Sequence, residues 1–211
     1  MIVRTVIGIA CLFWPVSCLQ AKPTLTGFAP RSAQIGAITE ITAQGTFAKW
    51  PVKIWVNRPG LEIKLGSPGK LSIKTSKTTL PGIYWIRFLD DTGASQAVPL
   101  ILDSLQTVIA TEPNESLKQP QPISLPANVS GVLEKGGDVD CYRVQCNKGQ
   151  VLVARMVANP LFGTSMDGVL QICNERGFVL DQNDDRHGID PCLSLKIPRD
   201  GSYYIRTFAF P

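Results

Sequence analysis

The chain has 211 residues and a formal net charge of +4, with 44% hydrophobic and 18% charged residues. Its basic residues are scattered rather than gathered in a block, which argues against nucleic-acid binding. No segment after residue 21 is long and apolar enough to cross a membrane, so a transmembrane segment in the mature chain is not expected.

The first 21 residues have the pattern of a secretory signal peptide. Arg4 supplies a positive start, residues 6–16 are almost wholly apolar, and Ala21 offers a small residue for cleavage. We therefore expect a secreted protein, extracellular or held at the cell surface. The alternatives are a periplasmic location or a lipid anchor on Cys18. The residues before Cys18 match a lipoprotein signal poorly, because Pro15 stands where Leu is usual.

Residues 22–108 show almost no helical periodicity and are rich in short apolar runs cut by glycine and proline. This pattern predicts an all-β domain, with strands at 52–56, 71–74, 83–88 and 98–102. About seven short strands in such a length are typical of an immunoglobulin-like sandwich.

Two tryptophans, Trp55 and Trp85, fall on the outward faces of these predicted strands. An exposed indole can stack on a sugar or anchor a partner protein. A contact between domains, or a wrongly assigned face, is the interpretation favoured here, because a shift of one residue reverses a strand's faces.

A second all-β block follows a proline-rich linker at residues 109–126, which contains Pro113, Pro120, Pro122 and Pro126. Residues 127–211 form this block, and the whole mature chain is therefore predicted to be two β-sandwich domains. Its strands are expected at 129–133, 138–144, 150–157, 169–172, 178–180, 193–197 and 203–208.

Four cysteines lie in the second block: Cys141, Cys146, Cys173 and Cys192. An exported chain meets an oxidising compartment, so two disulfides are possible, with three pairings open. Buried free thiols are the alternative. Zinc is less favoured, because there is no CxxC pair and the chain has one histidine.

Acidic and amide side chains gather at the linker and at the start of the second block. Glu112, Asn114 and Glu115 form one group, and Asp138 and Asp140 form another. If the second group lies in a strand, both of its carboxylates point to one face. Calcium requires six to eight oxygen ligands, which these five residues could help supply. Solvated turn residues are an equal alternative on residue chemistry alone.

A second polar loop contains Asp181, Asn183, Asp184, Asp185 and Asp190, and we favour turns over a metal site there. His187 lies in the same loop. It would have to be the general base of any catalytic triad, but the chain has no GxSxG or HExxH motif. An exposed loop histidine is the better interpretation.

The second block resembles the bacterial pre-peptidase C-terminal domain. The resemblance rests on residues spaced over about 100 positions: Glu112-Pro113-Asn114, Gly131, residues 137–144, Gly149-Gln150, Asp167, Gly177, Asn183-Asp184-Asp185, Asp190-Pro191 and residues 201–206. It implies a jelly-roll-like β-sandwich appended to exported proteins, with calcium held by acidic residues of the entry linker and an early strand. The resemblance therefore favours calcium binding by these five residues over the alternative of solvated turns.

The first block resembles IPT/TIG immunoglobulin-like domains at residues 23–47, with Pro30, Gly36 and Gly45. A signal peptide followed by both modules is similar to large exported proteins of planctomycete-type bacteria. The family pattern continues past Tyr203-Tyr204 with another hairpin, so the resemblance predicts an incomplete sandwich with an open edge.

The expected function is a non-catalytic binding or accessory module that engages an extracellular protein or polysaccharide, or positions a partner domain. The first alternative is the non-catalytic part of a larger secreted peptidase or other hydrolase. The second is a structural protein of the cell envelope.

Overall fold

The computed structural model describes residues 21–186 and 188–210. They are almost entirely β-structure, with one short helix, α1 (Asn159–Phe162), so the all-β prediction is confirmed. The signal peptide, its Cys18 and His187 lie outside the described residues. Within the described part, no helix is long and apolar enough to cross a membrane.

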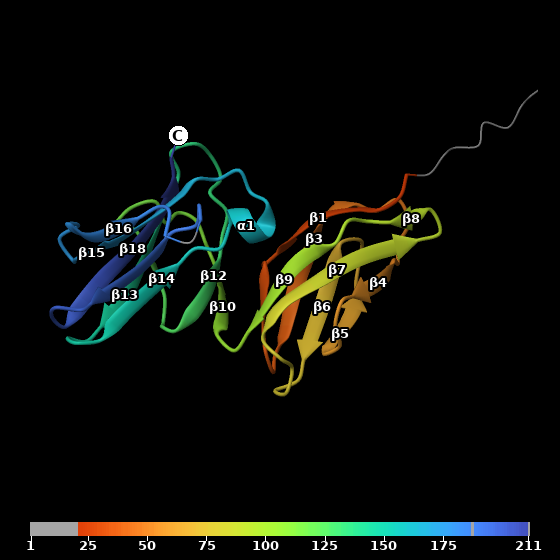
Figure 1. The fold of residues 1–211 in the computed structure, drawn as a ribbon, viewed down its shortest axis with the longest axis horizontal. Helices are drawn as coiled ribbons and strands as arrows, with labels where there is room; N and C mark the ends of the chain where they lie inside the picture. Colours follow the sequence, from red (N-terminus) through yellow and green to blue (C-terminus); the bar gives the residue numbers. More distant parts are fainter. Residues whose placement is uncertain (1–20, 187, 211) are drawn as a thin grey trace, which may run out of the picture.

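Two sheets pack face to face in the first half of the chain (Figure 1). One has the order β1 (Thr24–Ala29), β3 (Ile38–Thr46), β6 (Lys70–Thr75), β5 (Leu61–Leu65). The other has the order β2 (Ser32–Gln34), β9 (Val98–Asp103), β7 (Gly82–Asp90), β4 (Lys53–Val56), and β8 (Gly93–Ala94) pairs with β7.

Strand β7 shows why these segments form a sandwich. Tyr84, Ile86 and Phe88 alternate with more exposed residues and are 0–1% exposed, which follows from the two-residue period of a strand. They join a first hydrophobic core whose buried residues extend from Leu25 to Leu102. Strands β4, β6, β7 and β9 match four of the predicted runs, whereas β5 was not predicted.

The second half has its own core and its own sheets. The main sheet has the order β11 (Gln121–Pro122), β13 (Val139–Cys146), β18 (Gly201–Ala209), β15 (Gly168–Cys173), β16 (Val179–Asn183). The facing sheet contains β14 (Val151–Arg155) and β17 (Cys192–Lys196). The core between them is drawn from residues 144–203. Because β18 pairs with both β13 and β15, the last strand is not itself an open edge.

The segment between the two cores is more structured than an extended linker. Strand β10 (Gln106–Ile109) pairs in parallel with β12 (Ala127–Ser130). The segment between these two strands therefore begins and ends at neighbouring positions. The Gln121 amide donates to the Ile109 carbonyl, and its oxygen accepts from the Thr111 backbone N–H. This closed segment holds residues 111–120 against the second sandwich.

Candidate metal-binding site and its surroundings

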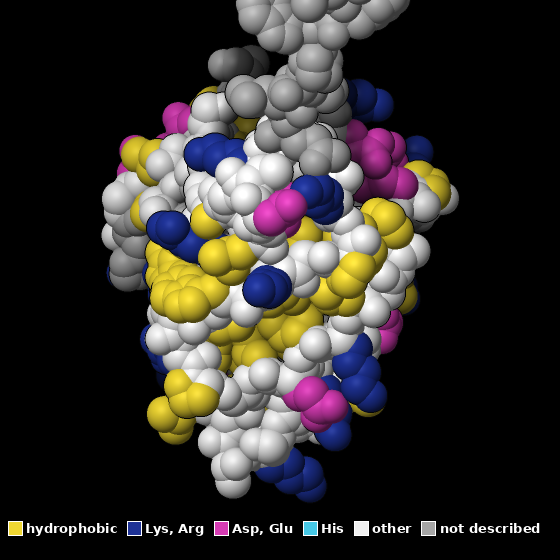
Figure 2. Space-filling view, turned by 90° about the vertical axis from the view of Figure 1, so that its right-hand side faces the viewer, with side chains coloured by type: hydrophobic (Ala, Val, Ile, Leu, Met, Phe, Trp, Pro, Cys, Tyr) yellow, Lys and Arg dark blue, Asp and Glu magenta, His cyan; other side chains and the backbone are white. Residues whose placement is uncertain are grey.

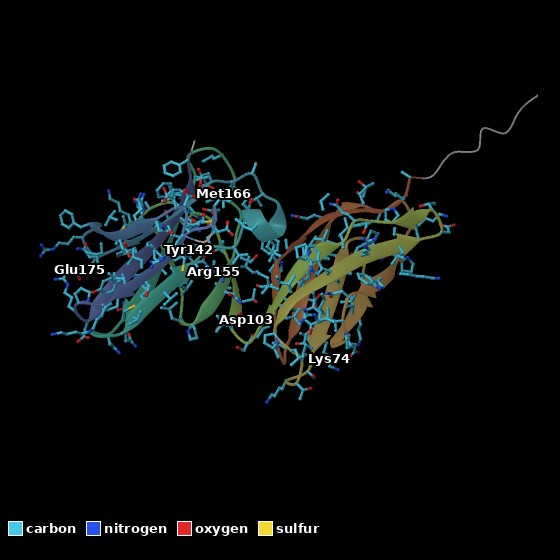
Figure 3. The ribbon with its side chains drawn as sticks, viewed as in Figure 1. Lys74, Asp103, Tyr142, Arg155, Met166 and Glu175 are labelled. Carbon is cyan, nitrogen blue, oxygen red and sulfur yellow. The ribbon has the colours of Figure 1, made fainter. Side chains whose placement is uncertain are left out.

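The candidate site forms where the linker folds back onto the start of β13. The backbone N–H of Cys141 donates to the Asn114 carbonyl at 2.9 Å, which fixes the linker against the strand. Asp140, Tyr142 and Val144 share the core-facing side of β13, because alternate residues of a strand point the same way. Tyr142 is labelled in Figure 3.

Asn114 is the most deeply buried side chain of the site. It is 0% exposed, and neither its amide nitrogen nor its oxygen has a hydrogen-bond partner among the described residues. Buried polar groups in native proteins are nearly always hydrogen-bonded, because an unpaired buried polar atom costs about 1–3 kcal/mol.

Asp140 lies beside it and is 3% exposed. Its Oδ2 accepts a hydrogen bond from the Tyr142 hydroxyl at 2.7 Å, while its Oδ1 has no partner among the described residues. Burial raises the pKa of Asp140, and the charges of Glu112 and Asp138 add to the rise. Tyr142 and Asn114 oppose it, although the Asn114 amide does not reach hydrogen-bonding geometry.

Tyr142 responds to the same environment. Burial raises the pKa of its hydroxyl, and the hydrogen bond to Asp140 raises it further. The hydroxyl therefore stays protonated and can act only as a donor toward the carboxylate. Gly131 closes the other side, since a Cβ there would stand 3.2 Å from Asp140 Oδ2 and 2.7 Å from the Ala110 Cβ.

The other three predicted ligands differ in their burial and in their hydrogen bonds near Asn114 and Asp140. Asp138 is buried just before β13, where its Oδ2 accepts from the Glu134 backbone N–H at 2.7 Å. Glu112 is exposed and accepts from the Asn114 N–H at 3.0 Å. Glu115 is exposed and makes no hydrogen bond within the described residues. The structure thus brings Glu112, Asn114, Asp138 and Asp140 near one another and leaves Glu115 aside.

The protein residues alone do not form a carboxylate cage. Within residues 21–186 and 188–210, no three His, Cys, Asp or Glu side chains are grouped so as to hold a metal ion. At this site, the buried side-chain oxygens without a hydrogen-bond partner among the described residues are Asn114 Oδ1 and Asp140 Oδ1. Tyr142 and Gly131 were not predicted as parts of the site, although the i, i+2 spacing of Tyr142 from Asp140 was a usable signal.

The second polar loop serves the fold. The Asn183 Oδ1 accepts from the backbone N–H groups of Arg186 and Cys192, as in a turn. The buried Asp190 accepts from the N–H groups of Ala158 and Asn159 at the start of α1. The side chains of Asn183 and Asp190 are therefore engaged by the backbone.

The four cysteines of the second block are free thiols, so the structure shows no disulfide among the described residues and matches the free-thiol alternative. The register explains why for one pair: β18 lies between β13 and β15, which places Cys141 and Cys173 two strands apart. Two strand spacings amount to about 10 Å, beyond the reach of a disulfide. Burial raises the pKa of the Cys141 thiol to about 11 and also raises the pKa of Cys173, which keeps both protonated.

The two tryptophans are exposed, Trp55 by 48% and Trp85 by 37%. The favoured interpretation, a contact between domains or a wrongly assigned face, is therefore wrong. Trp55 pairs across β4 and β7 with Arg87, which is two residues from Trp85 and on the same face. The outer face of this sheet carries indole rings and a guanidinium side by side.

No family model matches the chain. A probable subtilase-type serine protease of Deinococcus radiodurans is 30% identical over 120 residues, which cover 55% of this chain and 16% of that protein. The chain thus matches a small part of a much longer relative.

Two solved structures show weak likeness. A Bacteroides ovatus SGBP-B from a mixed-linkage glucan utilization locus, in complex with a heptasaccharide, aligns with 84% of this chain and 71% of its own at 8% identity and a TM-score of 0.28. The Yersinia pseudotuberculosis adhesin InvE aligns with 89% of this chain and 51% of its own at 12% identity and a TM-score of 0.27.

Proposed function

We propose that this chain is an exported, non-catalytic accessory module whose linker is stabilised by calcium. The observation that carries the proposal is the pair of buried side chains with unpaired oxygens, Asn114 and Asp140, at the point where the linker meets the second sandwich. A hard cation with a preference for amide and carboxylate oxygens would satisfy both.

The surrounding charges favour a cation over a water molecule. Glu112 and Asp138 both raise the pKa of Asp140, so negative charge accumulates around a buried carboxylate. A bound cation would remove that repulsion. Asn114 and Asp140 are the proposed direct ligands, Asp138 and Glu112 would contribute negative charge beside them, and solvent would complete the six to eight oxygens that calcium takes. Glu115 is left out because nothing places it near the pair.

The binding role belongs to the outer face of the first sandwich. Trp55, Trp85 and Arg87 lie together on strands β4 and β7, and large exposed aromatic side chains next to arginine are typical of surfaces that bind partners. We propose that this face engages an extracellular protein or a polysaccharide, or positions a partner domain.

A second candidate is the non-catalytic part of a larger secreted peptidase. The relative that favours it is a probable subtilase-type protease in which the matched segment is 16% of the length. In that case the module would sit beside a catalytic domain and would not take part in the chemistry. Hydrolysis of a protein substrate by this chain itself would overturn both candidates.

Thermal unfolding with and without calcium tests the metal proposal. A ligand that binds only the native state at 100 times its Kd stabilises it by about 2.7 kcal/mol, which corresponds to a rise in Tm of roughly 5–10 °C for a chain of this size. We expect this rise in the wild type and its loss in Asp140→Ala and Asp138→Ala. Asp185→Ala, an exposed aspartate of the second polar loop, is the matched control and should keep it. A wild-type Tm that does not respond to calcium would exclude the site.

A further inference from the structure

Strand β5 is an open edge. It ends the order β1–β3–β6–β5 and pairs with β6 alone among the described residues. An edge strand presents unpaired backbone N–H and C=O groups, which can template pairing with another chain. Whether β5 can accept another strand depends on which of its residues direct those groups outward.

The register with β6 identifies them. Gly66 donates its backbone N–H to the Lys70 carbonyl, and opposite residues of an antiparallel pair alternate between hydrogen-bonded and non-hydrogen-bonded positions. The backbone N–H and C=O groups of Glu62 and Lys64 are therefore directed toward β6, where they form the hydrogen bonds of the pair. Leu61, Ile63 and Leu65 direct theirs toward the open edge.

The side chains at this edge are apolar and incompletely covered. Leu61, Ile63 and Leu65 pack against the first core, yet each is only partly buried. Ile54 and Val56 of β4, an edge strand of the facing sheet, are also partly buried. Figure 2 views this end of the molecule and shows apolar side chains spread across it, with basic side chains among them. An exposed apolar surface of this kind is typical of an interface.

The sequence of β5 is self-complementary. It reads Leu-Glu-Ile-Lys-Leu, so an antiparallel copy centred on Ile63 places Leu61 opposite Leu65 and Glu62 opposite Lys64. Apolar residues meet apolar residues, and each charge meets its opposite, which stabilises cross-strand pairs. The residues that face one another in hydrogen-bonded positions are Leu61, Ile63 and Leu65, the same three that direct backbone groups outward.

We propose that β5 pairs with β5 of a second copy of this chain, about a two-fold axis at Ile63. The two four-stranded sheets then join into one continuous sheet. A two-fold interface uses the same patch on both copies, which is what a palindromic strand supplies. This proposal does not depend on the calcium site or on the ligand of the tryptophan face.

The charges explain why the occupant is a second copy rather than an arbitrary strand. Charged side chains on edge strands protect against unwanted pairing. Glu62 and Lys64 would repel a strand that places like charges opposite them, whereas an antiparallel copy of β5 places an opposite charge across from each. The neighbouring edge strand of the facing sheet, β4, reads Lys-Ile-Trp-Val and offers no such match with itself. Glu62 now pairs with Lys74 of β6, with both side chains more than half exposed, so it remains accessible.

Sedimentation equilibrium of the processed, exported chain over a range of concentrations tests the proposal. We expect a concentration-dependent dimer in the wild type. Glu62→Lys leaves lysines at 62 and 64, so each would face a lysine of the second copy. Lys64→Glu leaves two glutamates that would do the same. Each variant should raise the dimer Kd at least tenfold. Val153→Ala, an exposed residue of β14 in the second sandwich, should leave it unchanged.

Two rescues separate pairing from a general loss of structure. The double variant Glu62→Lys with Lys64→Glu restores the charge order and should dimerise like the wild type. A mixture of the two single variants should form a heterodimer, because lysines of one face glutamates of the other. A wild type that is monomeric throughout, a dimer that ignores both single changes, or a loss that neither rescue restores would overturn the proposal.

Discussion

Asn114 and Asp140 carry most of the chemical information in this chain. Both are almost completely buried, and both keep a side-chain oxygen that no described residue satisfies. The Tyr142 hydroxyl donates to the other oxygen of Asp140, and neither polar atom of the Asn114 side chain has a hydrogen-bond partner among the described residues. The calcium ion proposed above would satisfy both of these oxygens.

The raised pKa of Asp140 gives a prediction for the metal-free protein. A carboxyl whose folded pKa lies above its unfolded value stabilises the native state most at pH below the unfolded value, and that contribution is lost as the pH rises through the folded pKa. Without calcium, Asp140→Asn should therefore unfold at a higher urea concentration than the wild type at pH 7. The advantage should shrink as the pH falls below the folded pKa.

Calcium should reverse that order, because the variant loses a charged ligand. Urea titrations at several pH values, with EDTA or calcium, measure both effects. Asp185→Asn, an exposed aspartate, serves as the control. A variant that is less stable than the wild type at pH 7 in EDTA would contradict the assignment of Asp140 as an uncompensated buried charge.

At the scale of elements, α1 depends on a residue from a distant loop. Its own N-cap, Ala158, has no side chain that can accept a hydrogen bond. Asp190 supplies that acceptor, at 2.9 Å to the Ala158 N–H and 3.0 Å to the Asn159 N–H. The loop between β16 and β17 is thereby tied to the loop between β14 and β15.

Removing that carboxylate should destabilise the second sandwich. We expect Asp190→Ala to lower the free energy of unfolding by about 1–2 kcal/mol, the range found for lost helix caps. Asp190→Asn keeps one acceptor oxygen and should cost less. Chemical denaturation measures both, and Asp185→Ala in the same loop should be neutral. Equal stability of Asp190→Ala and the wild type would show that solvent satisfies these N–H groups.

At the scale of the whole molecule, the two sandwiches are joined by more than the chain. The Arg31 guanidinium lies 4.7 Å from the centroid of the Phe162 ring, so residues from the two halves contact each other. The Arg31 backbone N–H also donates to the Ser130 hydroxyl. Ser32 and Thr107 share a hydrogen bond nearby. These contacts surround the base of the linker that carries Asn114.

A double-mutant cycle on Arg31→Ala and Phe162→Ala tests the contact between the halves. Cation–π pairs at partly exposed sites are worth about 0.5–1 kcal/mol, so the two changes should be non-additive by that amount in denaturant unfolding. Phe178→Ala, an exposed aromatic of the second half, should be additive with Arg31→Ala. Full additivity at Phe162 would mean that the contact contributes nothing.

The sequence by itself determined the all-β class and most strand positions, because alternation of apolar residues is a local signal, as in β7 and β17. It also singled out Asn114, Asp138 and Asp140, since their spacing along the chain was visible. It missed β5, whose five residues lie between turn residues, and it left open whether the four cysteines of the second block form disulfides.

Tertiary structure alone decided burial and pairing. Only the fold could show that Asn114 is buried without a partner, that Glu115 stays outside, and that β18 separates Cys141 from Cys173. These facts depend on which distant segments lie side by side, and residue types along one chain do not encode that directly. The linker illustrates both limits: its prolines and its acidic and amide residues could be identified in the sequence, but the parallel pairing of β10 with β12 could not.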